Sequence, residues 1–242
     1  RVRRQRQMCI RDRVTHSTIW GVCDEDLFRR AVREADESCG RGVPFLQVVF
    51  TTSNHRPYTY PEGRIDIPSH TGRLGAVKYA DYSVGAFVEE ARSKPWFDNT
   101  LFVFVADHGA GSAGKKSLNP ETHRIFSIFY APALLKPERR ETAISQIDVL
   151  PTLLGLLKWP YDASFYGKDA LKPSYRSRYF VSNYQYIGYL RGDDMVVLKP
   201  QRGAEFYRDG NEVAPDDRMK ELEKEAIYYY QNASDWRKHL KE

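Results

Sequence analysis

The residues best suited to chemistry in this chain are an adjacent pair, Asp107 and His108, followed directly by Gly109. A carboxylate oxygen beside an imidazole nitrogen is a ligand combination that suits Mn²⁺ or Zn²⁺ better than Ca²⁺. A neighbouring glycine lets the backbone bend tightly around such a site. The pair can also serve structure alone, with Asp107 capping a turn and His108 packed as a polar residue. Both interpretations stay open from the residues alone.

A second candidate is His55, which lies in the run TTSNHRPY over residues 51–58. A histidine can contact an anionic group or make a local hydrogen bond, and its neighbours Pro57 and Tyr58 do not distinguish the two. Lys115 and Lys116 could meet an anionic substrate, although a solvated surface loop explains them equally well. These candidates therefore depend on where the fold places them.

Both His55 and Asp107 follow apolar runs of strand length, FLQVVF (45–50) and TLFVFVA (100–106). Between these runs, apolar residues recur at helical spacing over residues 74–91. Strand, helix and strand in this order predict a βαβ unit with parallel strands and a right-handed crossover. Since ligands bind outside the carboxyl ends of parallel strands, we expect the two loops to share one edge of the sheet.

The remaining pattern predicts an α/β fold up to about residue 158, followed by a small antiparallel sheet and a terminal helix. Asp148 stands where it could cap the helix over 149–157. Short apolar runs separated by turn signals predict the antiparallel strands. The other expected elements are a helix over 20–35, a strand over 125–130, strands over 179–182, 186–191 and 195–199, and a helix over 216–232.

The net charge of +5 comes entirely from residues 1–13, which hold six arginines and one aspartate. We expect this segment to be a non-native or disordered tail, and no nucleic-acid partner is expected for the neutral remainder. The longest apolar runs are far shorter than the ~20 residues that span a bilayer. We divide the chain into this tail, residues 14–172 as the C-terminal part of a catalytic domain, and residues 173–242 as the small sheet and helix packed on it.

Three cysteines, Cys9, Cys23 and Cys39, match no zinc or redox motif. A disulfide between Cys23 and Cys39 can form outside the cytoplasm, and free thiols are the alternative. The cysteines therefore leave the compartment open.

Five segments together resemble the sulfatase-fold phosphoglycerol transferases, which include the lipoteichoic acid synthase-like enzymes of the alkaline phosphatase superfamily. The resemblance covers about residues 19–172, in the family's order and spacing. It implies an α/β/α sandwich with a mostly parallel sheet. The segments are WGVCDEDLF (20–28), TTSNHRPY with its preceding strand (45–58), and the runs at 78–109, 123–135 and 145–157.

The resemblance also assigns roles. Asp107 and His108 match the family's metal-binding pair, for which Mn²⁺ is expected and Zn²⁺, Mg²⁺ or Ca²⁺ are alternatives. His55 matches a histidine that faces the substrate's phosphate. The implied donor is phosphatidylglycerol-like, an anionic phospholipid or related phosphodiester. The family is anchored by N-terminal membrane helices, not present in this chain, at the extracytoplasmic face of the bacterial membrane, in the periplasm or at the cell surface.

The family's nucleophile is a threonine upstream of the WGVCDEDLF segment, and no threonine in this chain matches its motif. Thr15 and Thr18 lie too close to Trp20, and Thr51 and Thr52 belong to the His55 motif. We therefore expect a fragment of a longer enzyme that is inactive and poorly metallated alone. Alternatives are a sulfatase, a phosphate- or phosphonate-ester hydrolase, and a non-catalytic relic or binding domain. Sulfatases often carry Asp-Asn where this chain has Asp-His, which favours phosphorus chemistry.

Overall fold

The computed structural model describes residues 14–109 and 118–239. The chain divides into two compact units. The first unit comprises Arg1–Phe102 and Phe129–Pro137, and the second comprises Val103–Ile128 and Glu138–Glu242. The basic tail (residues 1–13), Lys115 and Lys116 lie outside the described residues. The boundary between residues 172 and 173 stays a prediction.

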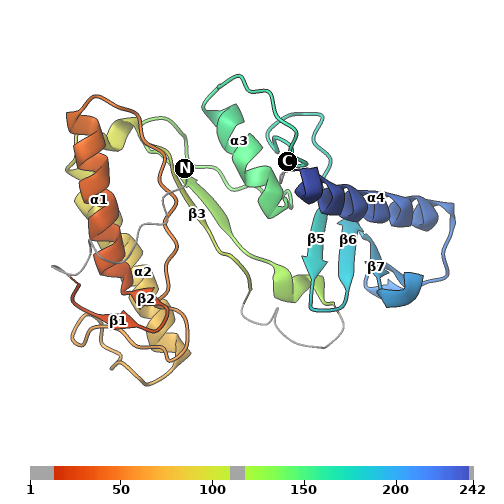
Figure 1. Cartoon of the computed structure of the whole chain (residues 1–242), viewed down its shortest axis with the longest axis horizontal. Helices are drawn as coiled ribbons and strands as arrows, with labels where there is room; N and C mark the ends of the chain where they lie inside the picture. The colour runs from red at the N-terminus through yellow and green to blue at the C-terminus, as the bar shows by residue number, and fades with distance from the viewer. Residues whose placement is uncertain (1–13, 110–117, 240–242) are drawn as a thin grey trace. The chain divides into compact units, whose positions relative to one another are not determined.

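The first unit contains two helices that follow a short hairpin (Figure 1). Helix α2 (Arg73–Arg92) agrees with the expected helix over 74–91, whereas α1 spans Asp24–Gly40 and so begins later and ends later than expected. The hairpin explains the late start, because its antiparallel strands β1 (Ser17–Thr18) and β2 (Gly21–Val22) use the residues just before α1. A short 3-10 helix, η3 (Phe97–Asn99), follows α2.

Helices α1 and α2 pack against each other through aromatic and polar contacts. The rings of Phe28 and Phe87 stack with centroids 4.7 Å apart. The Tyr79 hydroxyl donates a hydrogen bond of 2.9 Å to Glu25 Oε2. Tyr79 also stacks on Tyr60 at 5.0 Å, inside a buried cluster. The buried members of this cluster are Cys23, Tyr60, Ala76 and Tyr79.

Cys23 and Cys39 are both free thiols, so the disulfide alternative is not what the structure shows. Burial raises the pKa of the Cys23 thiol, and this outweighs the hydrogen bonds that favour the thiolate. A thiol in this state is a poor nucleophile near neutral pH. We therefore assign Cys23 to packing.

The predicted strand over residues 45–50 is wrong in the described part of the chain, where this segment pairs with no other strand. Leu46, Val48 and Phe50 point outward and are 84%, 77% and 76% exposed. The alternate residue Gln47 turns inward and donates to the Ala31 carbonyl. The period-two pattern is thus present, but a strand also needs a hydrogen-bonding partner. Without one, the expected parallel βαβ unit does not form among these residues.

Asp26 connects α1 to the segment before it and should contribute to acid sensitivity. Its buried carboxylate accepts hydrogen bonds from Thr15 N at 2.6 Å and His16 N at 3.4 Å, and it pairs with Arg29. Burial alone would raise its pKa, but the hydrogen bonds from Thr15, Cys23 and His16 together outweigh burial, so the pKa lies below the ordinary value of 3.8. The stabilisation is therefore complete above about pH 4 and is lost as the pH falls through the folded-state pKa.

We expect Asp26→Asn to lower the free energy of unfolding at pH 7 and to flatten its decline below about pH 4, because the variant no longer binds that proton on unfolding. Urea denaturation at a series of pH values measures this. Asp98→Asn, which changes an exposed carboxylate in η3, is the matched control. Parallel acid profiles for Asp26→Asn and the wild type would contradict the prediction.

The expected strands over 100–106 and 125–130 are confirmed in shortened form. They are β3 (Phe102–Val105) and β4 (Ser127–Tyr130), which pair in a two-stranded sheet. The start of β3 is buried because Phe102 packs against aromatic rings of the first unit. These rings are Phe87, Trp96, Phe97 and Tyr130.

The second unit contains helix α3 (Val149–Leu156), a five-stranded antiparallel sheet in the order β5-β6-β7-β8-β9, and helix α4 (Asp217–His239). Three of the strands match the expected ones closely. The fourth and fifth strands, β8 and β9, are not among the expected ones, and α4 extends beyond the expected end at residue 232. The strands are β5 (Tyr179–Ser182), β6 (Ile187–Arg191), β7 (Asp194–Leu198), β8 (Ala204–Arg208) and β9 (Asn211–Glu212).

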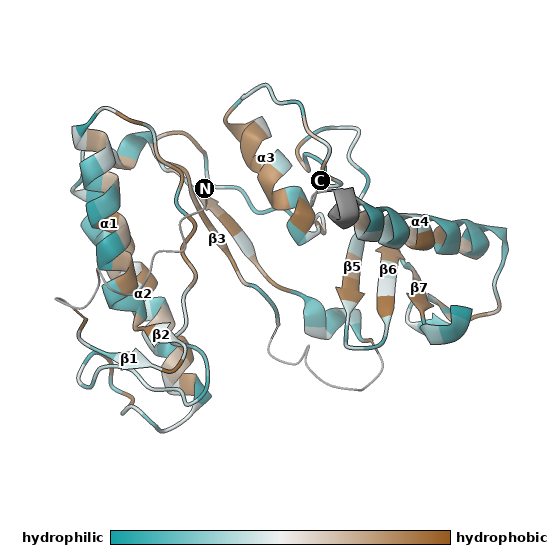
Figure 2. Cartoon of the chain, viewed as in Figure 1, coloured by the Kyte–Doolittle hydropathy of each residue, from teal (hydrophilic) through white to brown (hydrophobic). Residues whose placement is uncertain are grey.

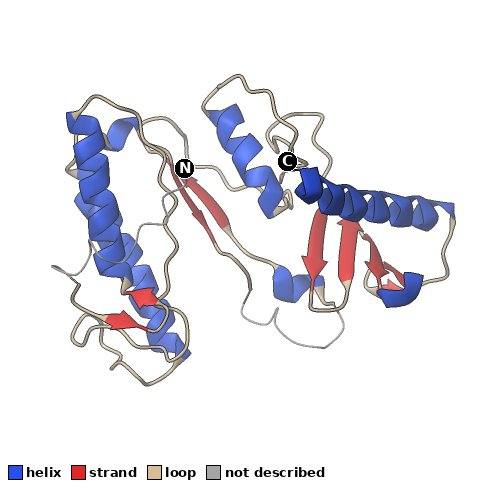
Figure 3. Ribbon diagram, in the orientation of Figure 1, coloured by secondary structure: helices blue, strands red, loops and turns tan. Residues whose placement is uncertain are grey.

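Helix α4 lies across this antiparallel sheet (Figures 1 and 3). In Figure 2, α4 is largely hydrophilic on its visible face, whereas α3 is mostly hydrophobic. The apolar side of α4 contributes Met219, Leu222 and Ala226 to a core with Tyr189, Val196 and Phe206. Among the described residues, no helix combines the length and apolar character needed to cross a membrane.

Asp148 has a different role from the one expected. It occupies the position before α3, but its side chain makes no capping bond to that helix. Instead the fully buried carboxylate accepts hydrogen bonds from Ser145 N, Lys168 N, the Tyr175 hydroxyl and Arg178 Nη1 at distances of 2.8 to 3.1 Å. Asp148 is therefore the buried anchor of the short 3-10 helix η5 (Gln146–Asp148).

Candidate active site

Asp107 and His108 lie just beyond the end of β3, as the sequence predicts. Their side chains are 75% and 64% exposed, so both can reach a ligand from solvent. The backbone N–H of His108 donates to Asp107 Oδ1 at 2.9 Å, which fixes one carboxylate oxygen and leaves Oδ2 free to turn toward the imidazole. Asp107 Oδ2 stands 3.6 Å from His108 Nε2.

The hydrogen bond made by the other imidazole nitrogen determines the chemistry of this pair. His108 Nδ1 lies 2.9 Å from the Gly109 carbonyl oxygen, which can only accept, so Nδ1 carries a proton. In the neutral imidazole, Nε2 then presents a lone pair toward Asp107 Oδ2. Two acceptors facing each other repel unless a proton or a cation lies between them. Protonated His108 or a bound metal satisfies this arrangement, and backbone carbonyls commonly orient metal-binding histidines in this way.

Gly109 is required at its position by close packing. A Cβ atom built on it would stand 2.3 Å from the Thr122 carbonyl oxygen, far inside contact distance. The turn that carries the pair therefore lies directly against the short 3-10 helix η4 (Pro120–His123). This packing holds the Gly109 carbonyl that orients His108.

The pair fits a divalent metal in ligand type but supplies only part of a coordination shell. Within residues 14–109 and 118–239, no group of three or more His, Cys, Asp or Glu side chains could hold a metal ion. A stable site needs at least four ligands, of which water or substrate can supply some. Two protein ligands alone would bind weakly.

His55 lies in the first unit, on an exposed turn that begins at Thr52. Its ring packs on Trp20 with centroids 3.7 Å apart, and Trp20 Nε1 donates to the Arg56 carbonyl at 2.6 Å. The turn contains a cis peptide bond between Arg56 and Pro57. The sequence pattern did not identify Trp20 as the residue that orients His55.

The loop before His55 is attached to α1 by Asp24. Its Oδ1 accepts hydrogen bonds from Thr52 N, Ser53 N and Ser53 Oγ at 2.8 to 3.0 Å. His55 belongs to one compact unit and the metal pair to the other, so their expected meeting at one sheet edge stays a prediction.

His123 makes structural contacts in the second unit. His123 Nδ1 lies 2.9 Å from the Asn119 carbonyl oxygen, and Nε2 lies 3.2 Å from the Ser182 carbonyl oxygen. His123 thus ties η4 to the end of β5. Asp81 is exposed on α2.

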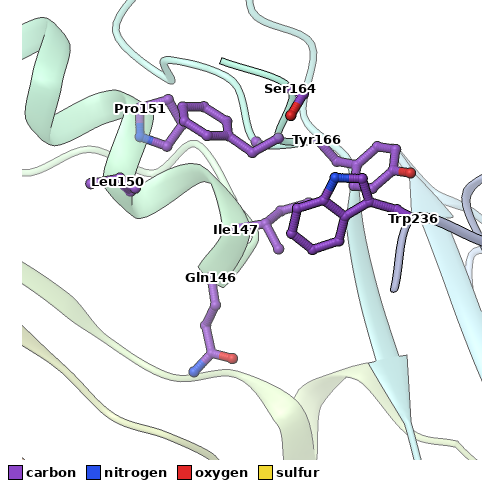
Figure 4. A pocket seen from close by; sticks show the side chains of 9 residues that line it. Gln146, Ile147, Leu150, Pro151, Ser164, Tyr166 and Trp236 are labelled. Atoms are coloured by element: carbon purple, nitrogen blue, oxygen red, sulfur yellow. The ribbon is translucent and has the colours of Figure 1, made fainter. Parts of the chain in front are cut away.

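An apolar groove of ≈ 310 Å³ lies in the second unit beside η5 and α3 (Figure 4). Ile147, Leu150 and Trp236 are among its partly exposed lining residues. Gln146 also borders the groove, but its side chain points away from the apolar residues. Its Nε2 atom donates to the carbonyls of Ala106 and Asp107, each at 2.9 Å. The SQID run drew attention to Gln146, but sequence alone gave it no role.

The α/β fold is that of the alkaline phosphatase superfamily. A solved structure of a protein in that superfamily from Vibrio parahaemolyticus superposes with a TM-score of 0.80 and 31% identity, covering 91% of this chain and 57% of that one. The sulfatase family model matches residues 3–159, and the chain belongs to the sulfatase family.

Two curated relatives are similar to part of this chain. The lipoteichoic acid synthase-like YvgJ of Bacillus subtilis is 26% identical over 164 residues, which is 58% of this chain and 26% of YvgJ. Phosphoglycerol transferase I of Escherichia fergusonii is 24% identical over 152 residues, which is 59% of this chain and 20% of that protein. The chain therefore spans about a quarter or less of the length of these relatives.

Proposed function

We propose that this chain contributes to a metal-dependent enzyme that transfers a phosphoglycerol-type group from an anionic, phosphatidylglycerol-like donor. Asp107 and His108 would hold the metal, and His55 would face the phosphate. The observation that carries this is the approach of Asp107 Oδ2 to His108 Nε2 at 3.6 Å, with Nδ1 committed to the Gly109 carbonyl. The names of the two curated relatives support the substrate class.

The chain's own residues would orient the His108 imidazole and supply negative charge beside it. The Gly109 carbonyl keeps the imidazole in the tautomer whose Nε2 can bind a metal, and the exposed Asp107 carboxylate supplies the negative charge beside it. Mn²⁺ is the ion that the family resemblance implies, with Zn²⁺, Mg²⁺ and Ca²⁺ as alternatives, and a mixed nitrogen and oxygen set suits Mn²⁺ or Zn²⁺ better than Ca²⁺. When bound, such an ion neutralises charge on the transferring group and favours an ionised hydroxyl nucleophile.

The proposed nucleophile is a threonine that does not occur at a matching position in this chain. We place the enzyme at the extracytoplasmic face of a bacterial membrane, where an anionic phospholipid donor is available. A second candidate is hydrolysis of a sulfate ester, which the sulfatase family model favours. The two differ in the substrate that is turned over.

We expect Mn²⁺ to bind weakly to this chain and specifically at Asp107 and His108. Paramagnetic broadening of the backbone amide signals of residues 107–109 detects weak binding, with the distant turn at Gly192 as the reference. Asp107→Ala and His108→Ala should each remove the broadening, while Asp193→Ala, which removes an exposed carboxylate at that distant turn, should not. Equal broadening in the wild type and both site variants would refute the metal assignment.

A further inference from the structure

Gln146 makes an unusual pair of hydrogen bonds to the backbone that carries the metal pair. One amide nitrogen, Nε2, donates to two successive carbonyl oxygens, those of Ala106 and Asp107, at 2.9 Å each. An amide group has two N–H bonds, so both are used. The bonds therefore hold two adjacent peptide groups, one of which joins Asp107 to His108.

The position of Gln146 is itself fixed by buried groups. It is the first residue of η5, where Ser145 and Asp148 bond to each other reciprocally through a capping box. The Asp148 backbone N–H donates to the Ser145 carbonyl at 2.9 Å, and Asp148 Oδ2 accepts from Ser145 N at 3.1 Å. The Asp148 carboxylate is in turn held by buried Arg178. The amide thus extends from a rigid, fully buried anchor to an exposed strand end.

We propose that Gln146 is a positioning residue for the metal pair, holding the backbone so that Asp107 Oδ2 and His108 Nε2 stay directed at one ion. This inference rests on the proposed function, because it gives Gln146 a purpose only if the pair binds metal. The residue itself does not touch the metal. Two peptide carbonyls fixed from outside restrict the rotation that would turn the Asp107 and His108 side chains apart. Residues that orient metal ligands typically change metal affinity by ~10- to 100-fold when they are replaced.

The test compares Gln146→Leu, which keeps the size but removes both donors, with Leu150→Ala. Leu150 lines the same groove on the neighbouring helix and makes no contribution to the metal pair, so it controls for altered packing. We measure hydrogen–deuterium exchange of the amides of residues 105–109 without metal. We then measure Mn²⁺ affinity from the broadening of the amides of residues 107–109.

Gln146→Leu should speed exchange at residues 105–109 roughly tenfold, because the strand end then opens more often and exposes its backbone N–H groups, and should leave exchange in β6 and β7 unchanged. It should also weaken Mn²⁺ binding roughly tenfold or more. Gln146→Arg, which retains N–H donors at a similar reach, should restore the slow exchange. Leu150→Ala should change neither the exchange at residues 105–109 nor the Mn²⁺ affinity.

Faster exchange with unchanged Mn²⁺ affinity would overturn the positioning role, and unchanged exchange in Gln146→Leu would overturn it at the first step. In both cases wild-type Mn²⁺ binding would leave the proposed function intact. If the wild type binds no Mn²⁺ at residues 107–109, the proposed metal site fails and the positioning role fails with it. Faster exchange in Gln146→Leu would then identify only a structural bond.

Discussion

Arg178→Ala is expected to lower the free energy of unfolding by about 3–5 kcal/mol, since it leaves the Asp148 carboxylate buried without a cation. The two side chains are 5% and 0% exposed, and Arg178 Nη1 lies 2.9 Å from both carboxylate oxygens. Arg178 Nη2 also donates to the Tyr166 carbonyl at 2.8 Å, so the variant also removes the donor to a partly buried acceptor. Equilibrium denaturation in urea measures the change.

Arg176→Ala is the matched control because Arg176 is exposed two residues away and should change stability by no more than ~0.5 kcal/mol. Arg178→Lys keeps the charge but loses the planar double contact, so we expect an intermediate loss. If Arg178→Ala and Arg176→Ala unfold at the same urea concentration, the buried pair contributes nothing beyond what a surface arginine does. The role of Asp148 as an anchor would then be rejected.

The local pattern of the sequence was sufficient to predict the C-terminal sheet. Short apolar runs of strand length, separated by turn signals such as that at Gly192, predicted β5, β6 and β7 almost to the residue. This succeeded because consecutive antiparallel strands find their partners next to them in the chain. Helix α2 was predicted for the same reason, since its pattern needs only local spacing.

The lack of strand pairing over residues 45–50 and the role of Asp148 could not be predicted, because both depend on residues distant in the sequence. The nearly continuous apolar run has the length and composition of a strand, but no local feature identifies a pairing partner. Asp148 looked like an ordinary helix cap, and its true partner, Arg178, lies 30 residues further along the chain. An ion pair between residues so far apart along the chain leaves no periodic pattern in the sequence.

In the candidate site, too, some features could be predicted from the sequence and others could not. The adjacent Asp107 and His108 were identified from residue type and position after a strand, while the tautomer of His108 required the Gly109 contact seen only in three dimensions. Trp20 against His55, and Gln146 against the Asp107 backbone, are contacts across 35 and 39 to 40 residues of sequence. Sequence therefore identified the proposed ligands, and the structure identified the groups that orient some of these side chains.

In a protein that carries these residues together with a nucleophile, Asp107→Ala or His108→Ala is expected to reduce turnover at least ~10³-fold, or about 4 kcal/mol in the activation free energy. Both side chains are largely exposed, so neither change should disturb the fold. Initial rates with an aryl phosphodiester and an aryl sulfate measure the effect and distinguish the two proposed reactions. Urea denaturation checks that each variant remains as stable as the wild type.

A comparison of His55→Ala with Asp107→Ala separates the loss of a substrate contact from the loss of a metal ligand. If His55 faces the phosphate, its loss should lower turnover while Mn²⁺ binding at residues 107–109 stays unchanged. Asp107→Ala should lower both. Faster cleavage of the sulfate than of the phosphodiester would favour the sulfatase alternative while retaining the metal pair. Near-normal turnover in Asp107→Ala with either substrate would instead reject the pair as metal ligands, because losing a carboxylate ligand removes both charge and geometry from the ion.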